Sequence, residues 1–260
     1  MTMDSDSKNA GHEAGMREDG LSEVPPQPAA AQAASHHPEE THAPIPHPVV
    51  PAALHAPELE EGIGYRPVLS EHDPDFDFLY DVYQEAFPPA ERRSRDQLIE
   101  EMGQPEVCVG LITYEGERAG FFIYWELEDF IYGGHFAIHE DLRGKGIGAL
   151  FLSQFLRWAA KPVIIEVEPP ENKIARRRIA FYEQLGLKLF PCDYKQPAYA
   201  PDKDAVPLYL MEAAAHTDLR ATNGRKAPQV LIPDDALLPW RYEQVKQSLY
   251  EYVYADSPRP

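Results

Sequence analysis

A glycine-spaced segment at residues 143–148, Arg-Gly-Lys-Gly-Ile-Gly, joins an apolar run to an apolar helix and constrains the fold more than any other feature of the chain. Glycines at alternate positions let backbone N–H groups converge without interference from Cβ atoms. The helix that follows, expected over Ile147–Ala160, adds its free N-terminal amides and the positive end of its dipole. The sequence therefore predicts a strand–loop–helix unit that cradles an anion, with a pyrophosphate as the favoured ligand.

Other interpretations of this loop are a plain turn, a dinucleotide fingerprint and a Walker A loop. Gly144 and Gly146 fit the dinucleotide spacing, and Glu166 lies where a ribose-binding acid is expected. That fingerprint needs its first glycine at the end of the strand, however, and residues 140–143 intervene here. A Walker A loop is excluded because Lys145 is followed by glycine rather than serine or threonine.

A second motif decides among these alternatives. Residues 178–187 read Arg-Ile-Ala-Phe-Tyr-Glu-Gln-Leu-Gly-Leu, a helix that ends in a glycine and leads into a strand. The two motifs, in this order and separated by one helix and one strand, resemble those of the GNAT superfamily of N-acetyltransferases. The resemblance covers residues 65–211 and implies a mixed α/β fold, with a central twisted mixed sheet flanked by helices. It also implies acetyl-CoA as co-substrate.

The resemblance assigns roles to particular residues. Tyr182 takes the position of the general acid that protonates the leaving thiolate. Phe136, Ala137 and Ile138 lie beside the pantetheine arm, and the backbone N–H near Ile138 polarises the acetyl carbonyl. The loop residues expected to bind the pyrophosphate are Arg143, Gly144, Lys145, Gly146, Ile147 and Gly148.

The general base is not settled by the motifs. Relatives often carry a glutamate on the strand before the loop, but this chain has Gly134 there, followed by His135. His135, Glu166 and Glu168 are candidates, and a base acting through water, or no dedicated base, stays open. The chain also departs from the family at Ala175, where many members have a coenzyme-contacting asparagine. Asn172 is three residues too early to replace it.

Hydrophobic periodicity predicts antiparallel strands followed by strand–helix–strand–helix–strand units. The two strands that flank the glycine-loop helix should be parallel. Pro67 places the first strand at an edge of the sheet. Strands are expected at residues 65–69, 107–113, 119–125, 130–139, 163–168, 187–192 and 206–211, and helices from Pro74, from Ser94 or Asp96, and over 147–160 and 173–185. The loops at residues 87–93 and 193–199 are expected to wall the acceptor site.

Composition divides the chain into three parts. Residues 1–61 are rich in Pro, Ala and His and poor in large apolar residues, so we expect a disordered tail. Its histidines lack a ligand spacing, and no metal is expected. Residues 62–213 should form the acetyltransferase domain. Residues 214–260 should form a loop and an amphipathic helix that begins near Pro239 and carries an apolar stripe at Tyr242, Val245, Leu249 and Val253.

The net charge of −19 argues against a nucleic-acid partner and favours amine or cationic substrates. No apolar run is long enough for a membrane helix, and the acidic N-terminus is not a secretory signal. Cys108 and Cys192 are expected as free thiols in a cytoplasmic monomer or homodimer. The predicted function is acetyl transfer from acetyl-CoA to an amine of a small molecule or peptide. The alternative is a non-catalytic acyl-CoA-binding module.

Overall fold

A single sheet of seven strands organises the part of the chain that the computed structural model describes, which is Leu59, residues 62–217 and residues 239–257. The strand order is β1-β2-β3-β4-β5-β7-β6, and only β4 and β5 run parallel among the paired neighbours. The strands are β1 (Ile63–Pro67), β2 (Val107–Tyr114), β3 (Glu117–Glu126), β4 (Ile131–Ile138), β5 (Val163–Val167), β6 (Lys188–Gln196) and β7 (Val206–Ala213). The predicted mixed α/β class is confirmed, as is the parallel pairing around the glycine-loop helix.

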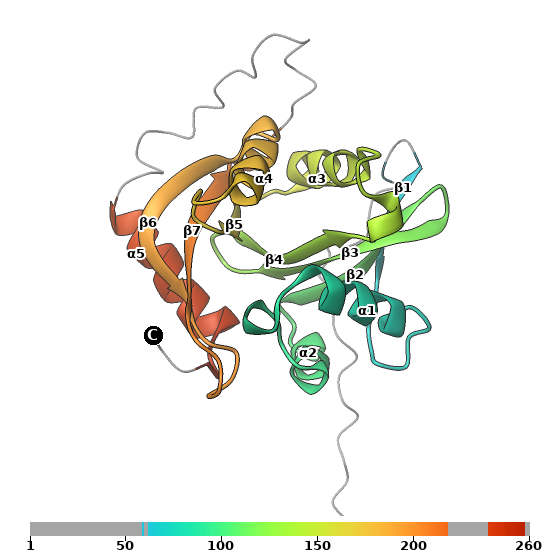
Figure 1. The fold of residues 1–260 in the computed structure, drawn as a ribbon, viewed down its shortest axis with the longest axis horizontal. Coiled ribbons are helices and arrows are strands. Elements are labelled where there is room, and N and C mark those ends of the chain that lie inside the picture. Colours follow the sequence, from blue (N-terminus) through green and yellow to red (C-terminus); the bar gives the residue numbers. More distant parts are fainter. Residues whose placement is uncertain (1–58, 60–61, 218–238, 258–260) are drawn as a thin grey trace, which may run out of the picture. The chain divides into compact units, whose positions relative to one another are not determined.

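Helices cover both faces of this sheet. In Figure 1, α3 and α4 lie on one face and α1 and α2 on the other. The helices are α1 (Phe76–Ala86), α2 (Arg95–Met102), α3 (Ile147–Trp158), α4 (Lys173–Gln184) and α5 (Pro239–Ser248), which continues as the π-helix η6 (Leu249–Val253). Short 3₁₀ turns occur at η2 (Pro89–Glu91) and η3 (Glu140–Leu142). None of the helices in the described ranges is both long and apolar enough to cross a membrane.

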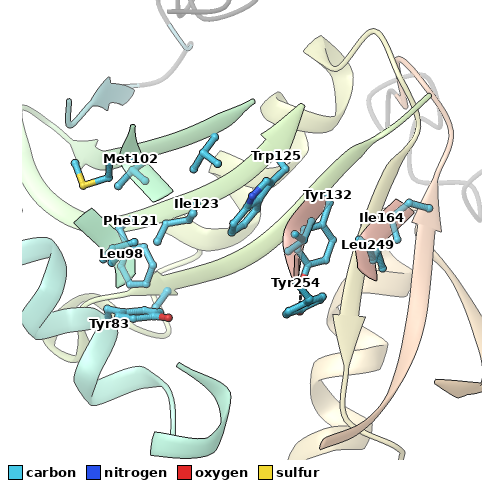
Figure 2. Packing of buried hydrophobic residues seen from close by; sticks show 14 of the residues in the cluster. Tyr83, Leu98, Met102, Phe121, Ile123, Trp125, Tyr132, Ile164, Leu249 and Tyr254 are labelled. Carbon is cyan, nitrogen blue, oxygen red and sulfur yellow. Dashed lines mark hydrogen bonds between the residues drawn. The ribbon is translucent and has the colours of Figure 1, made fainter. Parts of the chain in front are cut away.

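Each face of the sheet buries its own apolar cluster. One cluster joins α1 and α2 to the C-terminal segment, and it includes Trp125 and Leu249 (Figure 2). The other cluster packs α3 and α4 against the opposite face, through residues such as Phe151 and Ile179. The apolar stripe predicted for the C-terminal helix is buried at Val245, Leu249 and Val253. That segment is therefore part of the core.

Side-chain caps explain where two of the helices begin. The Ser94 hydroxyl accepts from the backbone N–H of Gln97, and the Ser94 backbone N–H donates to the side-chain oxygen of Gln97, which forms a capping box at α2. Asn172 accepts from the backbone N–H groups of Ile174 and Ala175 and caps α4. The asparagine that is too early for the family's coenzyme position is thus a helix cap here.

The observed strand bounds differ from the predicted ones most clearly at β1 and β6. β1 begins and ends two residues earlier than expected, and it lies at the edge of the sheet as Pro67 predicts. β6 continues to Gln196, so residues 193–196 belong to a strand rather than to a loop. A register shift between Phe190 and Tyr194 lets the long strand stay paired with β7. The tail before Leu59 and the segment 218–238 lie outside the described residues.

The parallel pair β4–β5 is short, and this opens the sheet. Ile131, Tyr132 and Gly133 pair with Val163, Ile164 and Ile165, and no pairing continues beyond them. β4 nevertheless runs on to Ile138 and β5 to Val167. The two strands therefore part at their carboxyl ends, where open α/β sheets bind ligands.

Candidate active site

A cavity of about 500 Å³ lies where β4 and β5 part. The end of α1, the loop before α2, α4, β6 and β7 complete its walls. Eight of the residues predicted for the site line it: His135, Phe136, Ala137, Ile138, Arg143, Glu166, Glu168 and Tyr182. The remaining predicted residues, Gly144 to Gly148, lie in the adjoining loop and at the first turn of α3. One cavity thus collects residues from distant parts of the sequence.

A backbone N–H group of β4 points toward the gap between β4 and β5. The N–H of His139 donates to the carbonyl of Ala119 on β3, over 2.9 Å. Because successive N–H groups of a strand point to opposite sides, the N–H of Ile138 faces away from β3. It points to the side where β4 has no strand partner. This amide can polarise a carbonyl placed in the cavity.

The glycine loop is shaped as an anion cradle requires. Gly144 and Gly146 have φ angles of 77° and 81°, which are disfavoured for residues with a side chain. A Cβ built on either glycine would meet no atom within 4 Å, so the space above the loop is open. Gly146 is also the N-cap residue of α3, whose first free amides face this space. The loop can therefore accept a phosphate group at the helix N-terminus.

Arg143 stands between the loop and the cavity. Its Nε donates to the carbonyl of Ile138 over 2.9 Å, and its Nη2 pairs with Glu85 on α1 at 2.7 Å. The side chain remains half exposed. Its guanidinium thus ties the end of β4 to α1 and keeps a positive charge at the rim next to the glycine loop.

Tyr182 projects from α4 into the cavity. Its hydroxyl has no hydrogen-bond partner within the part of the chain that the structure describes. Burial raises the pKa of Tyr182 to about 12, the charge of Arg178 acts in the opposite direction, and Glu168 adds to the increase. The phenol therefore keeps its proton at neutral pH and can donate it to a group in the cavity.

Glu166 is held by three tyrosines. Tyr132 donates to its Oε2 over 2.8 Å, Tyr254 lies 2.9 Å from Oε2 and 3.1 Å from Oε1, and Tyr194 also donates to Oε1. Burial raises the pKa of this carboxyl, while the hydrogen bonds from the phenols and the charge of Arg93 lower it. A carboxylate has about four acceptor positions and each phenol has a single proton, so at least one position is left for a ligand.

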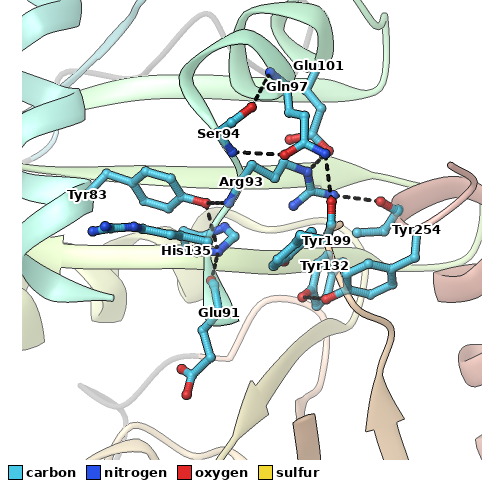
Figure 3. Close-up of polar contacts among 12 residues, drawn as sticks. Tyr83, Glu91, Arg93, Ser94, Gln97, Glu101, Tyr132, His135, Tyr199 and Tyr254 are labelled. Carbon is cyan, nitrogen blue, oxygen red and sulfur yellow. Dashed lines mark hydrogen bonds and ion pairs between the residues drawn. The ribbon is translucent and has the colours of Figure 1, made fainter. Parts of the chain in front are cut away.

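His135 lies on β4, almost fully buried beside α1. Its Nε2 donates to the carbonyl of Glu91 over 3.1 Å and lies 3.3 Å from the hydroxyl of Tyr83 (Figure 3). Burial, and secondarily the charge of Arg93, lower its pKa to about 3. The ring is thus neutral at physiological pH, and its Nε2 proton is already engaged with the protein.

The buried side chain of Arg93 connects several residues next to the cavity. Arg93 forms an ion pair with Glu101 and donates from Nη2 to the carbonyl of Val253 over 2.7 Å. Its guanidinium lies 4.3 Å from the ring centre of Tyr199 and 5.7 Å from that of Tyr254, within the range of cation–π contacts (Figure 3). Arg93 therefore joins the loop before α2 to the C-terminal segment.

The outer wall is acidic. Glu91 and Glu168 both line the cavity, and Glu168 is paired with Arg178. The carboxylate of Glu91 has no ion-pair partner among the described residues, and Figure 3 shows it pointing away from the Arg93 network. Burial and the nearby charge of Glu168 raise its pKa. A cation in the cavity would relieve both effects.

The structure also explains the missing glutamate on β4. A Cβ at Gly134 would lie 2.5 Å from Cζ3 of Trp125, so a side chain there would collide with a buried ring. Glu166 on the neighbouring strand β5 supplies a carboxylate to the cavity instead. The loop at residues 87–93, which is predicted to wall the acceptor site, contributes Phe87, Pro88 and Glu91 to the cavity.

Three tyrosine contacts of Glu166 were not predicted. Tyr132 lies in a predicted strand, Tyr194 lies in a predicted loop, and Tyr254 follows the predicted C-terminal helix, so no motif connects these residues with Glu166. Their partner is 34, 28 and 88 residues away in the sequence. Local sequence patterns do not indicate contacts between residues so far apart in the chain.

Within the described ranges no group of acidic, histidine or cysteine side chains could hold a metal ion.

Comparisons with known proteins agree with this architecture. The acetyltransferase (GNAT) family model matches residues 76–187. A putative GNAT-family acetyltransferase from Bacteroides thetaiotaomicron is 28% identical, with a TM-score of 0.61 over 74% of this chain and 98% of that chain. No curated protein matches the chain.

More distant solved structures carry similar descriptions. A GNAT family acetyltransferase from Elizabethkingia anophelis with acetyl-CoA bound is 14% identical, with a TM-score of 0.42 over 60% of this chain and 99% of that chain. The ribosomal-protein-S18-alanine N-acetyltransferase from Escherichia coli is 21% identical, with a TM-score of 0.42 over 58% and 93%. The family match over residues 76–187, the likeness to the Bacteroides protein and the two motifs in their predicted order support the predicted resemblance of this part of the chain to the GNAT superfamily of acetyltransferases.

Proposed function

We propose that the protein is an acetyl-CoA-dependent N-acetyltransferase that transfers the acetyl group directly to an amine of a small molecule or peptide. The observation that carries this proposal is the cavity between β4 and β5, which joins a backbone donor, a free phenol and a carboxylate. Direct transfer needs the two reactants to be aligned in one place, and a single cavity of this size can hold both reacting ends.

The donor half binds the coenzyme. Residues 143–148 hold the pyrophosphate at the N-terminus of α3, and Phe136, Ala137 and Ile138 lie along the pantetheine arm. The N–H of Ile138 receives the negative charge that develops on the thioester oxygen. The open space above Gly144 and Gly146 supports this placement.

Two side chains of the cavity, Glu166 and Tyr182, transfer the protons of the reaction. Glu166 takes a proton from the incoming ammonium through its remaining acceptor position, and the C–N bond then forms as the C–S bond of the thioester breaks. Tyr182 gives a proton to the departing thiolate and recovers one from the acylated nitrogen. Glu166 is favoured over His135 as the base, because the Nε2 proton of His135 is engaged by Glu91 and its pKa of about 3 makes it a weak base. The phenol of Tyr182 is supported as the acid by its free hydroxyl.

The acceptor itself is a cationic amine. Glu91, Glu166 and Glu168 line the cavity, and the net charge of −19 adds an attractive field for cations. The buried amide nitrogen of Gln196, which has no partner among the described residues, offers a hydrogen bond to an oxygen of the acceptor. Both a basic peptide and a polyamine-like molecule satisfy this chemistry.

An acceptor screen tests the function. Purified protein is mixed with acetyl-CoA and a panel of amines, and release of free thiol is followed together with acetylated product. We expect thiol release that depends on the amine. Tight acetyl-CoA binding without release across amines of varied charge and length would favour the non-catalytic module instead. If calorimetry detects no acetyl-CoA binding at millimolar ligand, both the acetyltransferase and the non-catalytic module are overturned.

A further inference from the structure

The C-terminal segment reaches Glu166 from outside the region that matches the family model. That region ends at residue 187, whereas Tyr254 follows η6. The hydroxyl of Tyr254 lies 2.9 Å from Oε2 of Glu166 and 2.9 Å from the hydroxyl of Tyr132. Tyr254 is 2% exposed and stands behind the carboxylate rather than on the cavity surface.

Several contacts fix Tyr254 in this place. Its backbone N–H donates to the carbonyl of Leu249 over 3.0 Å, which closes the wide turn of the π-helix. The preceding carbonyl, of Val253, accepts from Arg93 over 2.7 Å. Leu249 is fully buried in the core below. Interruptions of this kind in a helix often occur at functional sites.

The surroundings of Glu166 define what Tyr254 adds. Tyr132 on β4, Tyr194 on β6 and Tyr254 in the C-terminal segment donate hydrogen bonds to Glu166, and the charge of Arg93 before α2 favours its anion. Tyr199 and Tyr250 also face it but have no hydrogen bond to it, and they interact with its charge only when their own phenols ionise. Burial favours the protonated carboxyl, and hydrogen bonds donated to the anion oppose it. Tyr254 is within hydrogen-bond distance of both carboxylate oxygens, so its loss removes one of the main contacts that favour the anion.

We infer that Tyr254 is a positioning residue of the acceptor site, which holds the Glu166 carboxylate ionised and directed into the cavity. The C-terminal segment is then a functional part of the enzyme. Its role in catalysis rests on the proposed function, in which Glu166 accepts the proton of the amine. The hydrogen bonds themselves do not depend on that assignment.

Tyr254→Phe removes the hydroxyl and keeps the ring. Tyr250→Phe is the matched control, because Tyr250 lies in the same segment but donates to the carbonyl of Lys195 over 2.8 Å. The titration of Glu166 is followed by difference infrared spectroscopy of ¹³C-glutamate protein, with its band assigned by its loss in Glu166→Gln. We expect the pKa of Glu166 to rise by about one unit or more in Tyr254→Phe and to stay unchanged in Tyr250→Phe.

The acidic limb of kcat/KM against pH should move up by the same amount in Tyr254→Phe. An unchanged Glu166 titration in the folded variant overturns the inference. A shifted titration without acetyl transfer by the wild type supports the role of Tyr254 but overturns the proposed function. If Tyr254→Phe does not fold, 2,3-difluorotyrosine at position 254 supplies a stronger donor. It should lower the pKa of Glu166, and no shift there would also overturn the inference.

Discussion

The hydroxyl of Tyr83 lies 3.3 Å from Nε2 of His135, and the two rings meet edge to face with their centres 4.8 Å apart. Phe87 packs against the same imidazole at 4.9 Å, also edge to face. The ring is thus enclosed by aromatic groups and has little access to water. This enclosure is the physical cause of its lowered pKa of about 3, with Arg93 as a secondary cause.

His135 should make the stability of the protein depend on pH. Between about pH 6.5 and 3 the unfolded chain binds a proton on this residue that the folded chain does not bind. The contribution of the neutral His135 to the free energy of unfolding is therefore fully present above pH 6.5. It is lost as the pH falls toward 3, by at most about 1.4 kcal/mol per pH unit. Urea unfolding at pH 7.5 and 5.0 should show a smaller loss of stability in His135→Gln than in the wild type.

The exposed His72 provides the control for that experiment, because His72→Gln should behave as the wild type. Equal losses of stability in the wild type and in His135→Gln would mean that the folded protein protonates His135 readily. That result would restore His135 as a candidate base.

Substitution at Gly146 should separate backbone strain from coenzyme binding. Gly146 and Gly116 have φ angles of 81° and 83°, and a Cβ at either position meets no atom within 4 Å. Alanine at each position should therefore cost a similar stability, about 1 kcal/mol. Only Gly146→Ala should weaken acetyl-CoA binding, by about tenfold or more, because its methyl group enters the space assigned to the pyrophosphate. Calorimetric titration of both variants checks this, and equal affinities would place the pyrophosphate elsewhere.

Tyr182→Phe should lower kcat about 100-fold, the typical effect of losing an acid–base group, and leave the Kd of acetyl-CoA unchanged. The ring packing against Phe181 is kept, since only the hydroxyl is removed. Steady-state kinetics and calorimetry measure the two quantities. Tyr114→Phe on β2, which does not line the cavity, is the control. An unchanged kcat would leave solvent as the proton source for the thiolate.

Glu91→Gln should weaken acceptors that carry two positive charges more than acceptors that carry one. The carboxylate is partly exposed and has no protein cation paired with it in the described ranges, so it is free to bind one from the substrate. We expect KM for a dication to rise about fivefold, the upper end for a partly exposed ion pair. Glu100→Gln on the exposed side of α2 should have no effect. Equal changes for both kinds of acceptor would argue against charge recognition by Glu91.

The elements of the fold could be predicted because their signals are local. Alternating apolar residues located the strands of the sheet, and the glycine loop with its following helix identified the parallel β4–β5 pair. The ends of a strand are not predicted by local signals where pairing with a neighbouring strand decides how far it extends. β6 runs on to Gln196 because a register shift keeps it bonded to β7, and the apolar pattern around Cys192 does not reveal this.

Residues of the candidate site could be predicted only where they belong to a recognisable sequence motif. The motifs located the glycine loop and Tyr182, whereas the partners of Glu166 come together only in the folded chain. Tyr254 reaches Glu166 because the C-terminal segment packs on the sheet through Leu249 and Arg93, and nothing near residue 254 in the sequence indicates this. Similarly, the glycine at position 134 makes sense only once Trp125 is known to fill the adjacent space.

Only three residue pairs hold β4 to β5, and beyond them the peptide groups of β4 remain available to a ligand. On the proposed assignment, the thioester is recognised there by main-chain atoms, which every amino-acid sequence possesses. The amine, in contrast, meets side chains contributed by residues 87–93 and by β6. Mutations could then retune the choice of acceptor while the acyl-transfer machinery persists. A protein built in this way can acquire new substrates without first losing its chemistry.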